Sequence, residues 1–551
     1  MFIKNYTISF LKMQQYFLFY LYEFLTNLRY KCYNIYINKL KENIMAQNLK
    51  LNLENLQEIR QMNPRLMSYN VEMTEVTGGT FWKAYTEGQV AGTEEFPKLE
   101  GSFSNHTAMA GLMQYYPPID TTNEKLIKLS KEFGPVWVRV SGTWATKTYY
   151  DFDGTTGGQP PKGYQSVLTR EQWANILGFV KAVDGKLLVS VSNCAGDHDE
   201  NNGPISLTQI TKLFDLTTEL GGKIDALEFM NEPNMLQISG APLGYDFPDF
   251  IRDQDIINGW VRENYPECLI VGPCNTGMTD EKPEGAVAQM GAGMGNMFKM
   301  GTAHDLLRGH QVKMDVYSYH YYNGISERLA GMMPTGHWPA EMAHSDAYLQ
   351  VAPGICYMNI PVRDKYVPGA EMWVTESGDA GGGGDTWAST YLDVLRTLNE
   401  LGSFCTLTNG VIFHNTLASS DYGFLQHGTF DPRPNYFAVL LWTRLMGNTV
   451  YACGNPNVEG AHLYCHSRKD GKEGYTYLLI NNSLTDATTV ELPGEATLYE
   501  LSGNGNMRNK VMHLNGRPLV LGENNELPCL CGEKVSGTIS IAPGSCAFIV
   551  V

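Results

Sequence analysis

The chain has 551 residues, 43% of them hydrophobic, and a formal net charge of −17. Its length exceeds one ordinary domain, and its hydrophobic content is that of a globular protein. The negative charge argues against non-specific binding to nucleic acid or to an anionic membrane. Because no cluster of Lys or Arg is visible, we expect one local anion pocket and not a long basic groove for a heavily sulfated polymer.

The 11 cysteines are scattered, with no C-x-x-C pair and no metal-binding spacing to histidine. Cys529 and Cys531 form the only close pair. An odd count in a chain of this size indicates mostly reduced thiols and no disulfide framework. We also expect no metal and no cofactor.

Residues 1–44 differ in composition from the rest, since 12 of these 44 residues are Phe or Tyr. Their apolar run, 16–22, is far too short to span a membrane, and no small-residue cleavage site follows it. We therefore expect a non-core extension from a mis-called start, with Met45 as the true first residue. The protein would then be cytoplasmic, or exported or periplasmic if residues 1–44 act as a degenerate signal.

From Asn48 onward the pattern is that of a folded domain. Residues 49–53 alternate as in a half-buried strand, and apolar runs then alternate with segments of helical spacing, which indicates β/α units around a parallel sheet. The expected strands lie at 65–73, 136–140, 186–193, the run from 226, 269–273, 314–322, 371–377 and 410–414. The clearest helical segments are 126–133, 170–183, 207–220 and 390–401. Eight such strands close a (β/α)8 TIM barrel, expected over 65–445.

After residue 445 the pattern changes to short alternating strands separated by Gly, Asn and Pro turns. The strands expected here are 461–464, 476–480, 489–492 and 545–550. This pattern predicts an additional C-terminal antiparallel β-sandwich over 446–551, packed on the barrel. The fold class is therefore α/β with a second, all-β domain.

Two apolar runs each end in a glutamate. The run from Ala226 breaks at Asn231-Glu232-Pro233, where Pro233 lacks an N–H and should end the strand. A second run, 371–376, ends at Glu376. Barrels place their chemistry at the C-terminal ends of strands, and a carboxylate on each of two strands is the minimum for glycoside hydrolysis.

These stretches resemble the clan of retaining (β/α)8 glycosidases, and within it the heparanase-like β-glucuronidases of glycoside hydrolase family 79. The matching segments are 138–143, 231–234, 320–324, 375–384 and 430–436. The resemblance implies that Glu232 is the acid/base and Glu376 the nucleophile. It also implies that the N-terminal strand within 45–64 joins the β-sandwich.

Consecutive glycine N–H groups form anion-binding concavities, and the run Gly381 to Gly384 follows Glu376 closely. The resemblance implies that N–H groups of this loop, at Gly381 and Gly382, bind the uronate carboxylate and that the hydroxyl of Tyr422 adds to them. It further implies that Glu72 and Thr143 meet sugar hydroxyls.

Other side chains are expected around the two carboxylates. Asn231 can hydrogen-bond the sugar 2-hydroxyl. His320 and Tyr322 should face the same pocket, whereas Tyr319 and Tyr321 point the other way and belong to the core. Arg139 either keeps Glu376 ionised or forms a structural ion pair at the barrel mouth.

The lead hypothesis is a retaining β-glucuronidase that acts on glucuronides or uronic-acid glycans. The alternatives are a retaining glycosidase for a neutral sugar, such as a xylosidase, and a non-catalytic carbohydrate-binding barrel. Val140-Ser141 replaces an aromatic residue and a glycine of the family pattern, and Ser318-Tyr319-His320 stands where the family tends to have a His pair. Because segment 327–364 could also roof the cleft, endo and exo action both stay open.

Overall fold

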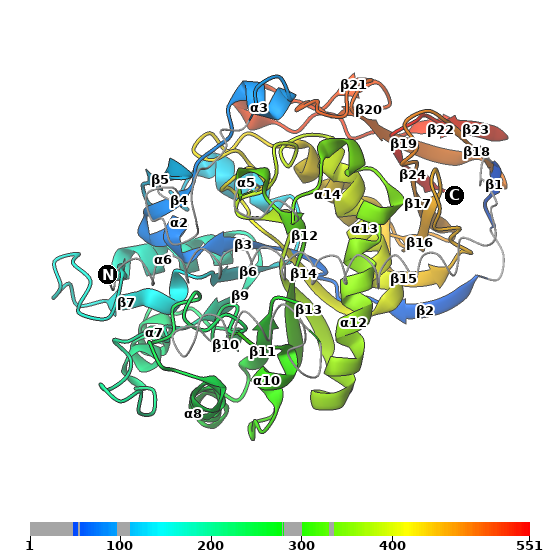
Figure 1. The fold of residues 1–551 in the computed structure, drawn as a ribbon. Coiled ribbons are helices and arrows are strands. Elements are labelled where there is room, and N and C mark those ends of the chain that lie inside the picture. The colour runs from blue at the N-terminus through cyan, green and yellow to red at the C-terminus, as the bar shows by residue number, and fades with distance from the viewer. Residues whose placement is uncertain (1–47, 53–55, 96–110, 278, 280–299, 330–335) are drawn as a thin grey trace, which may run out of the picture.

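The computed structural model describes residues 48–52, 56–95, 111–277, 279, 300–329 and 336–551. The extension over 1–44 and the expected start at Met45 lie outside these residues. Figure 1 shows a barrel of strands surrounded by helices, with a second, all-β domain beside it.

Eight parallel strands form a closed barrel in which β14 pairs back to β3, so that Ile412 lies opposite Met67. The strands are β3 (Met67–Glu72), β6 (Val136–Ser141), β9 (Gly185–Ser190), β10 (Ala226–Glu228), β11 (Leu269–Asn275), β12 (Val316–Ile325), β13 (Glu371–Gly381) and β14 (Gly410–His414). The predicted barrel is confirmed. Strands β12 and β13 run on together well past the barrel, to Ile325 and Gly381.

Helices cover the outside of the barrel (Figure 1). The longer ones are α5 (Glu124–Lys131), α6 (Arg170–Ala182), α7 (Thr208–Glu219), α8 (Phe247–Asn264), α12 (Val351–Tyr366), α13 (Leu392–Leu407) and α14 (Pro434–Leu445). Helix α6 illustrates the local cause: Thr169 and Gln172 form a reciprocal capping box at its start, and Trp173, Ile176 and Phe179 follow at helical spacing and are buried.

Apolar side chains fill the half of the barrel interior that lies toward the N-terminal ends of the strands. These residues are Trp137, Leu188, Ala226, Val271, Val316, Trp373, Val411 and Phe413. The rings of Trp137 and Trp373 meet with centroids 4.7 Å apart. Since alternate residues of a strand share a face, Arg139 and Glu228 stand on the same side as Trp137 and Ala226, one step nearer the C-terminal mouth.

The second domain contains a nine-stranded and a three-stranded sheet. Its strands are β1 (Asn48–Lys50), β2 (Gln57–Gln61), β15 (Met446–Ala452), β16 (His462–Arg468), β17 (Tyr475–Ile480), β18 (Thr488–Glu491), β19 (Ala496–Ser502), β20 (His513–Leu514), β21 (Arg517–Pro518), β22 (Glu533–Val535), β23 (Thr538–Ile541) and β24 (Cys546–Val550). All pairs are antiparallel except β1 with β18. Both N-terminal strands therefore lie in the C-terminal domain, as the blue arrows beside the orange ones show in Figure 1.

Polar contacts and buried apolar surface join the two domains. Tyr464 of β16 donates to Asn399 of α13 at 2.7 Å, and Tyr391 donates to the carbonyl of Leu501 at 2.7 Å. A disulfide links Cys529 and Cys531, the close pair of the sequence. None of the described helices combines the length and apolarity that crossing a membrane requires.

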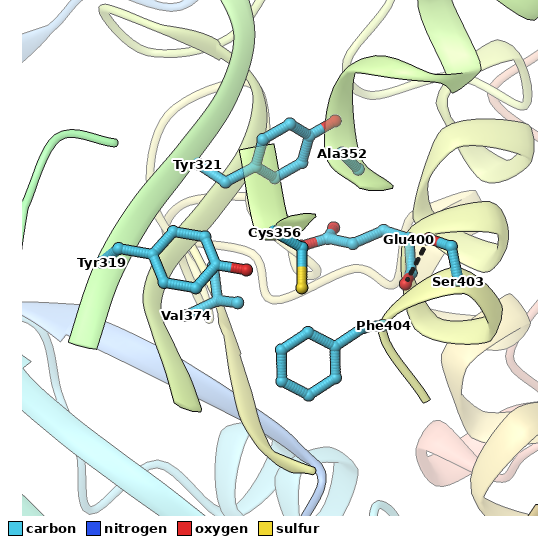
Figure 2. Close-up of a pocket in the computed structure, with 8 residues that line it drawn as sticks. All are labelled: Tyr319, Tyr321, Ala352, Cys356, Val374, Glu400, Ser403 and Phe404. Atoms are coloured by element: carbon cyan, nitrogen blue, oxygen red, sulfur yellow. Dashed lines mark hydrogen bonds between the residues drawn. The ribbon is translucent and has the colours of Figure 1, made fainter. Parts of the chain in front are cut away.

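Tyr319 and Tyr321 point away from the barrel interior, as predicted. They line a cavity of about 10 Å³ between β12, β13 and helices α12 and α13, together with Cys356, Glu400 and Phe404 (Figure 2). This space is at most enough for one water molecule. The cavity is a packing feature behind the barrel wall and not a ligand site.

Candidate active site

The two predicted carboxylates meet at the C-terminal mouth of the barrel. Oxygens of Glu232 and Glu376 and a ring nitrogen of His320 lie within 4.8 Å of one another. Neither glutamate ends its strand, contrary to the expectation: β10 ends at Glu228, and β13 continues to Gly381 because it stays paired with β12. Glu232 instead occupies a left-handed backbone conformation with φ 45°.

Three groups surround the carboxylate of Glu376, which is almost fully buried. Arg139 donates to Oε1 at 3.1 Å and the Tyr322 hydroxyl donates to Oε2 at 2.8 Å, while His320 Nδ1 lies 3.5 Å from Oε2. Burial raises the pKa of Glu376, but His320, Arg139 and the Tyr322 hydrogen bond outweigh it, so this pKa lies below its usual value. Glu376 is therefore held ionised.

Glu232 has a more open environment. Its side chain is 19% exposed, against 7% for Glu376. His320 Nδ1 lies 3.0 Å from Oε1 of Glu232, and the Ser239 hydroxyl donates to the backbone carbonyl of Glu232 at 2.7 Å. The carboxyl group of Glu232 is thus more accessible to solvent than that of Glu376.

Arg139 is fully buried and contacts both β10, which leads to Glu232, and β13, which carries Glu376. Besides its bond to Glu376, its Nε donates to Oε1 of Glu228 at 2.9 Å, and its Nη2 donates to Oδ1 of Asn231 at 2.8 Å. Burial lowers the pKa of Arg139, but Glu228 and its other neighbours outweigh it and raise this pKa well above the usual value. Arg139 therefore forms buried ion pairs with both Glu228 and Glu376, and its part in substrate binding stays a prediction.

His320 lies between the two glutamates, and Cys274 contacts the opposite side of its ring. Its Nε2 lies 3.0 Å from the Cys274 sulfur. Burial lowers the pKa of His320, but Cys274 and Glu376 outweigh it and raise this pKa well above the usual value. A charged His320 favours the ionised form of Glu376.

Glu72 lies at the end of β3 and is buried beside this group. Burial, together with the negative charge of Glu376, raises the pKa of Glu72 well above the usual value. Its Oε2 has no hydrogen-bond partner among the described residues. A Cβ at Gly142 would come within 1.7 Å of that oxygen, so only glycine fits there. Thr143 follows, and Asn231 Nδ2 reaches its hydroxyl at 3.5 Å.

The glycine run and Tyr422 come together at the side of Glu376. Gly382, Gly383 and Gly384 have φ of 94°, 94° and 86°. Asp421, next to Tyr422, donates its N–H to Gly383 O at 3.0 Å. Within the described part of the chain, the N–H groups of Gly382 and Gly383 have no hydrogen-bond partner. Tyr422 itself stacks on Tyr322, with ring centroids 6.4 Å apart.

The structure thus brings all the predicted site residues to one end of the barrel. It adds three that the sequence reasoning missed, namely Glu228, Cys274 and Asn415. Glu228 carried a usable signal, because a charged residue inside an apolar strand needs a buried partner. Cys274 lies within β11 and Asn415 directly follows β14, and neither carried a comparable signal.

No protein-family model matches the chain. It is 25% identical to heparanase-like protein 1 of Arabidopsis thaliana over 500 residues, 79% of this chain and 85% of the relative. It is 30% identical to baicalin-β-D-glucuronidase of Scutellaria baicalensis over 189 residues, 33% of this chain and 36% of the relative. A 4-O-α-L-rhamnosyl-β-D-glucuronidase structure from Fusarium oxysporum matches 91% of this chain and all of its own, with a TM-score of 0.57 at 12% identity. The relatives confirm the resemblance read from the motifs, and the solved structure confirms the fold.

Proposed function

We propose that this protein is a retaining β-glucuronidase that cleaves β-glucuronides or uronic-acid-containing glycans. The observation that carries the proposal is that one carboxylate oxygen of Glu232 and one of Glu376 lie within 4.8 Å of each other at the mouth of the barrel. Retaining glycosidases hold their two carboxyl groups about 5–5.5 Å apart, whereas inverting ones leave about 6.5–9.5 Å for a water molecule. The similarity to proteins named as heparanase-like and as a glucuronidase supports the same activity.

The surroundings of Glu376 support the proposed roles of the two carboxylates. Glu376 is ionised and attacks the anomeric carbon, while Glu232 gives its proton to the departing glycosidic oxygen. Glu232 then takes a proton from the water that attacks the glycosyl-enzyme, and Glu376 leaves as a carboxylate. Arg139 and His320 hold Glu376 ionised before the attack and stabilise it again when the ester breaks.

The uronate carboxylate is assigned to the space between the glycine run and Tyr422. The sequence predicted the N–H groups of Gly381 and Gly382, but Gly381 ends strand β13 opposite Ile325. The N–H groups of Gly382 and Gly383, which have no partner among the described residues, and the Tyr422 hydroxyl are donors, which suits an anion. A neutral sugar such as xylose has no group that would use these donors. Asn231, Thr143 and Glu72 are left to contact the sugar hydroxyls.

The test compares kcat/KM for an aryl β-glucuronide with that for the aryl β-xyloside with the same leaving group. The proposal predicts a strong preference for the glucuronide, and Glu376→Gln is the matched inactive control. A preference for the xyloside would replace the glucuronidase with a neutral-sugar glycosidase. Binding of both glycosides without turnover would make the protein a non-catalytic carbohydrate-binding barrel.

A further inference from the structure

Asn415 follows strand β14 and lies between the nucleophile and the uronate site. Its side-chain Nδ2 donates to the Tyr322 hydroxyl oxygen at 2.8 Å and to the Tyr422 hydroxyl oxygen at 3.2 Å. Asn415 is 2% exposed. The side-chain amide therefore contacts both tyrosines beside the proposed binding site of the glucuronate ring.

Hydrogen-bond chemistry fixes which way this amide points. The backbone carbonyl of Thr375 can only accept, so the Asn70 side-chain atom 3.0 Å away from it must be the Nδ2 donor. That same Asn70 Nδ2 lies 3.2 Å from the Asn415 side chain, which must present its oxygen there. The NH2 group of Asn415 is left facing the two tyrosines.

Each tyrosine hydroxyl has one proton, and a bond accepted from Asn415 leaves that proton free for another acceptor. The Tyr322 hydroxyl donates a hydrogen bond to Glu376 Oε2 at 2.8 Å. The Tyr422 hydroxyl has no acceptor among the described residues. Burial, with the negative charges of Glu72 and Glu376, raises the pKa of Tyr422 well above the usual value, so this phenol keeps its proton.

We propose that Asn415 is a positioning residue that turns both tyrosine protons outward, one toward the nucleophile and one toward the substrate carboxylate. The assignment of the substrate carboxylate rests on the function proposed above, whereas the effect on Glu376 does not. One amide thereby couples the charge of the nucleophile to recognition of the uronate. Asn415 acts through the tyrosines and is not itself required to touch the reacting atoms.

The isosteric variant Asn415→Asp tests this directly. A carboxylate in place of the amide accepts hydrogen bonds from both tyrosine hydroxyls and so turns their protons toward position 415. Even when protonated, a carboxyl group has one O–H donor, whereas the amide has two N–H donors. Asn415→Ala removes the amide but leaves both tyrosine protons free. We therefore expect kcat/KM for the glucuronide to fall over about 100-fold in Asn415→Asp and less than about 10-fold in Asn415→Ala.

A role in packing alone makes Asn415→Ala the more damaging change, because it leaves a cavity. Asn415→Asp also places a carboxyl group in a buried site, so its cost is compared with the cost of the same change in a Tyr322→Phe/Tyr422→Phe background, where no tyrosine proton is left to turn; equal costs would overturn the positioning role. The pH profile provides a second readout. Loss of the Tyr322 hydrogen bond raises the pKa of Glu376, and so does the negative charge of a carboxylate at position 415. The acid limb of kcat/KM should therefore move further to higher pH on Asn415→Asp in the wild-type background than in a Tyr322→Phe background, where only the charge effect remains. The other groups that face Glu376 are Arg139, His320, Glu232, Glu72 and Tyr422. Both variants keep these residues but remove the Asn415 hydrogen bond that lowers the pKa of Glu72.

Two further measurements keep the inference testable if Asn415→Asp folds poorly or the proposed function fails. In a Tyr422→Phe background, Asn415→Ala should cost less on the glucuronide than it does in the wild type, and equal costs would overturn the inference. The pKa of Glu376 can be read without turnover by carboxyl 13C NMR of labelled glutamate, with Glu376→Gln for assignment. An unchanged pKa in Asn415→Asp, or a larger loss in Asn415→Ala than in Asn415→Asp, contradicts the positioning role.

Discussion

Removal of the Tyr422 hydroxyl separates recognition of the carboxylate from the chemistry. The ring is 3% exposed and packed against Tyr322 and the glycine run, so Tyr422→Phe keeps the shape of the pocket. Among the described residues the hydroxyl only accepts a hydrogen bond from Asn415, which still donates to Tyr322 at 2.8 Å after the change. Tyr422→Phe therefore removes mainly the hydrogen bond to the bound substrate carboxylate, and few contacts within the protein.

A hydrogen bond to a charged group contributes roughly 1.5–3 kcal/mol, which is about a 10- to 150-fold change in kcat/KM. We expect Tyr422→Phe to lower kcat/KM for the aryl glucuronide by this factor and to leave the aryl xyloside almost unchanged. The assay is the ratio of the two kcat/KM values in the wild type and the variant.

Tyr436→Phe is a matched control, because this buried tyrosine donates to the carbonyl of Leu129 at 2.9 Å, away from the carboxylates. It should lower the melting temperature without altering the substrate ratio. If Tyr422→Phe lowers both substrates equally, its hydroxyl does not read the carboxylate, and the reasoning is refuted.

Three other changes follow from the same geometry. Glu232→Gln should hurt substrates with poor leaving groups most, because only they need protonation; equal losses for good and poor leaving groups would count against the acid/base role. Gly382→Val should raise KM for the glucuronide and also lower the melting temperature, since its φ is 94° and a Cβ would lie 2.8 Å from Leu329; an unchanged KM would remove this loop from the uronate site. Tyr322→Phe removes one group that lowers the pKa of Glu376, so the acid limb of kcat/KM should move to higher pH, and a limb that stays in place would show that the hydroxyl does not stabilise the carboxylate.

The barrel was predictable from the sequence because apolar runs mark most of its strands, separated by segments of helical spacing. Strand β14 was expected at 410–414 and lies at Gly410–His414. The less apolar strand β2 was missed, since its sequence Gln-Glu-Ile-Arg-Gln has no alternating apolar pattern and is held by pairing with β15. Pairing of distant segments supplies what local composition does not.

The site was predictable where chemistry leaves a local signature. Asn231-Glu232-Pro233 and the glycine run are such signatures, and Arg139 followed from its place on a barrel strand. Asn415 and Cys274 could not be found in this way, because their roles arise only when the closed barrel brings β14 beside β3 and β11 beside β12. The continuation of β13 beyond Glu376 likewise depends on its partner β12 and not on its own residues.

The central claim is that Glu376 forms a covalent glycosyl-enzyme. A 2-deoxy-2-fluoro-β-glucuronosyl fluoride should trap this intermediate. The 2-fluorine slows both its formation and its hydrolysis, whereas the good leaving group speeds its formation only, so the intermediate accumulates. Intact-protein mass spectrometry should show one added fluoroglucuronosyl group, and peptide mapping should place it on Glu376. Glu376→Gln, treated in the same way, should gain nothing. A label on another residue, or turnover of the glucuronide with no trapped intermediate and inverted product stereochemistry, would contradict the account.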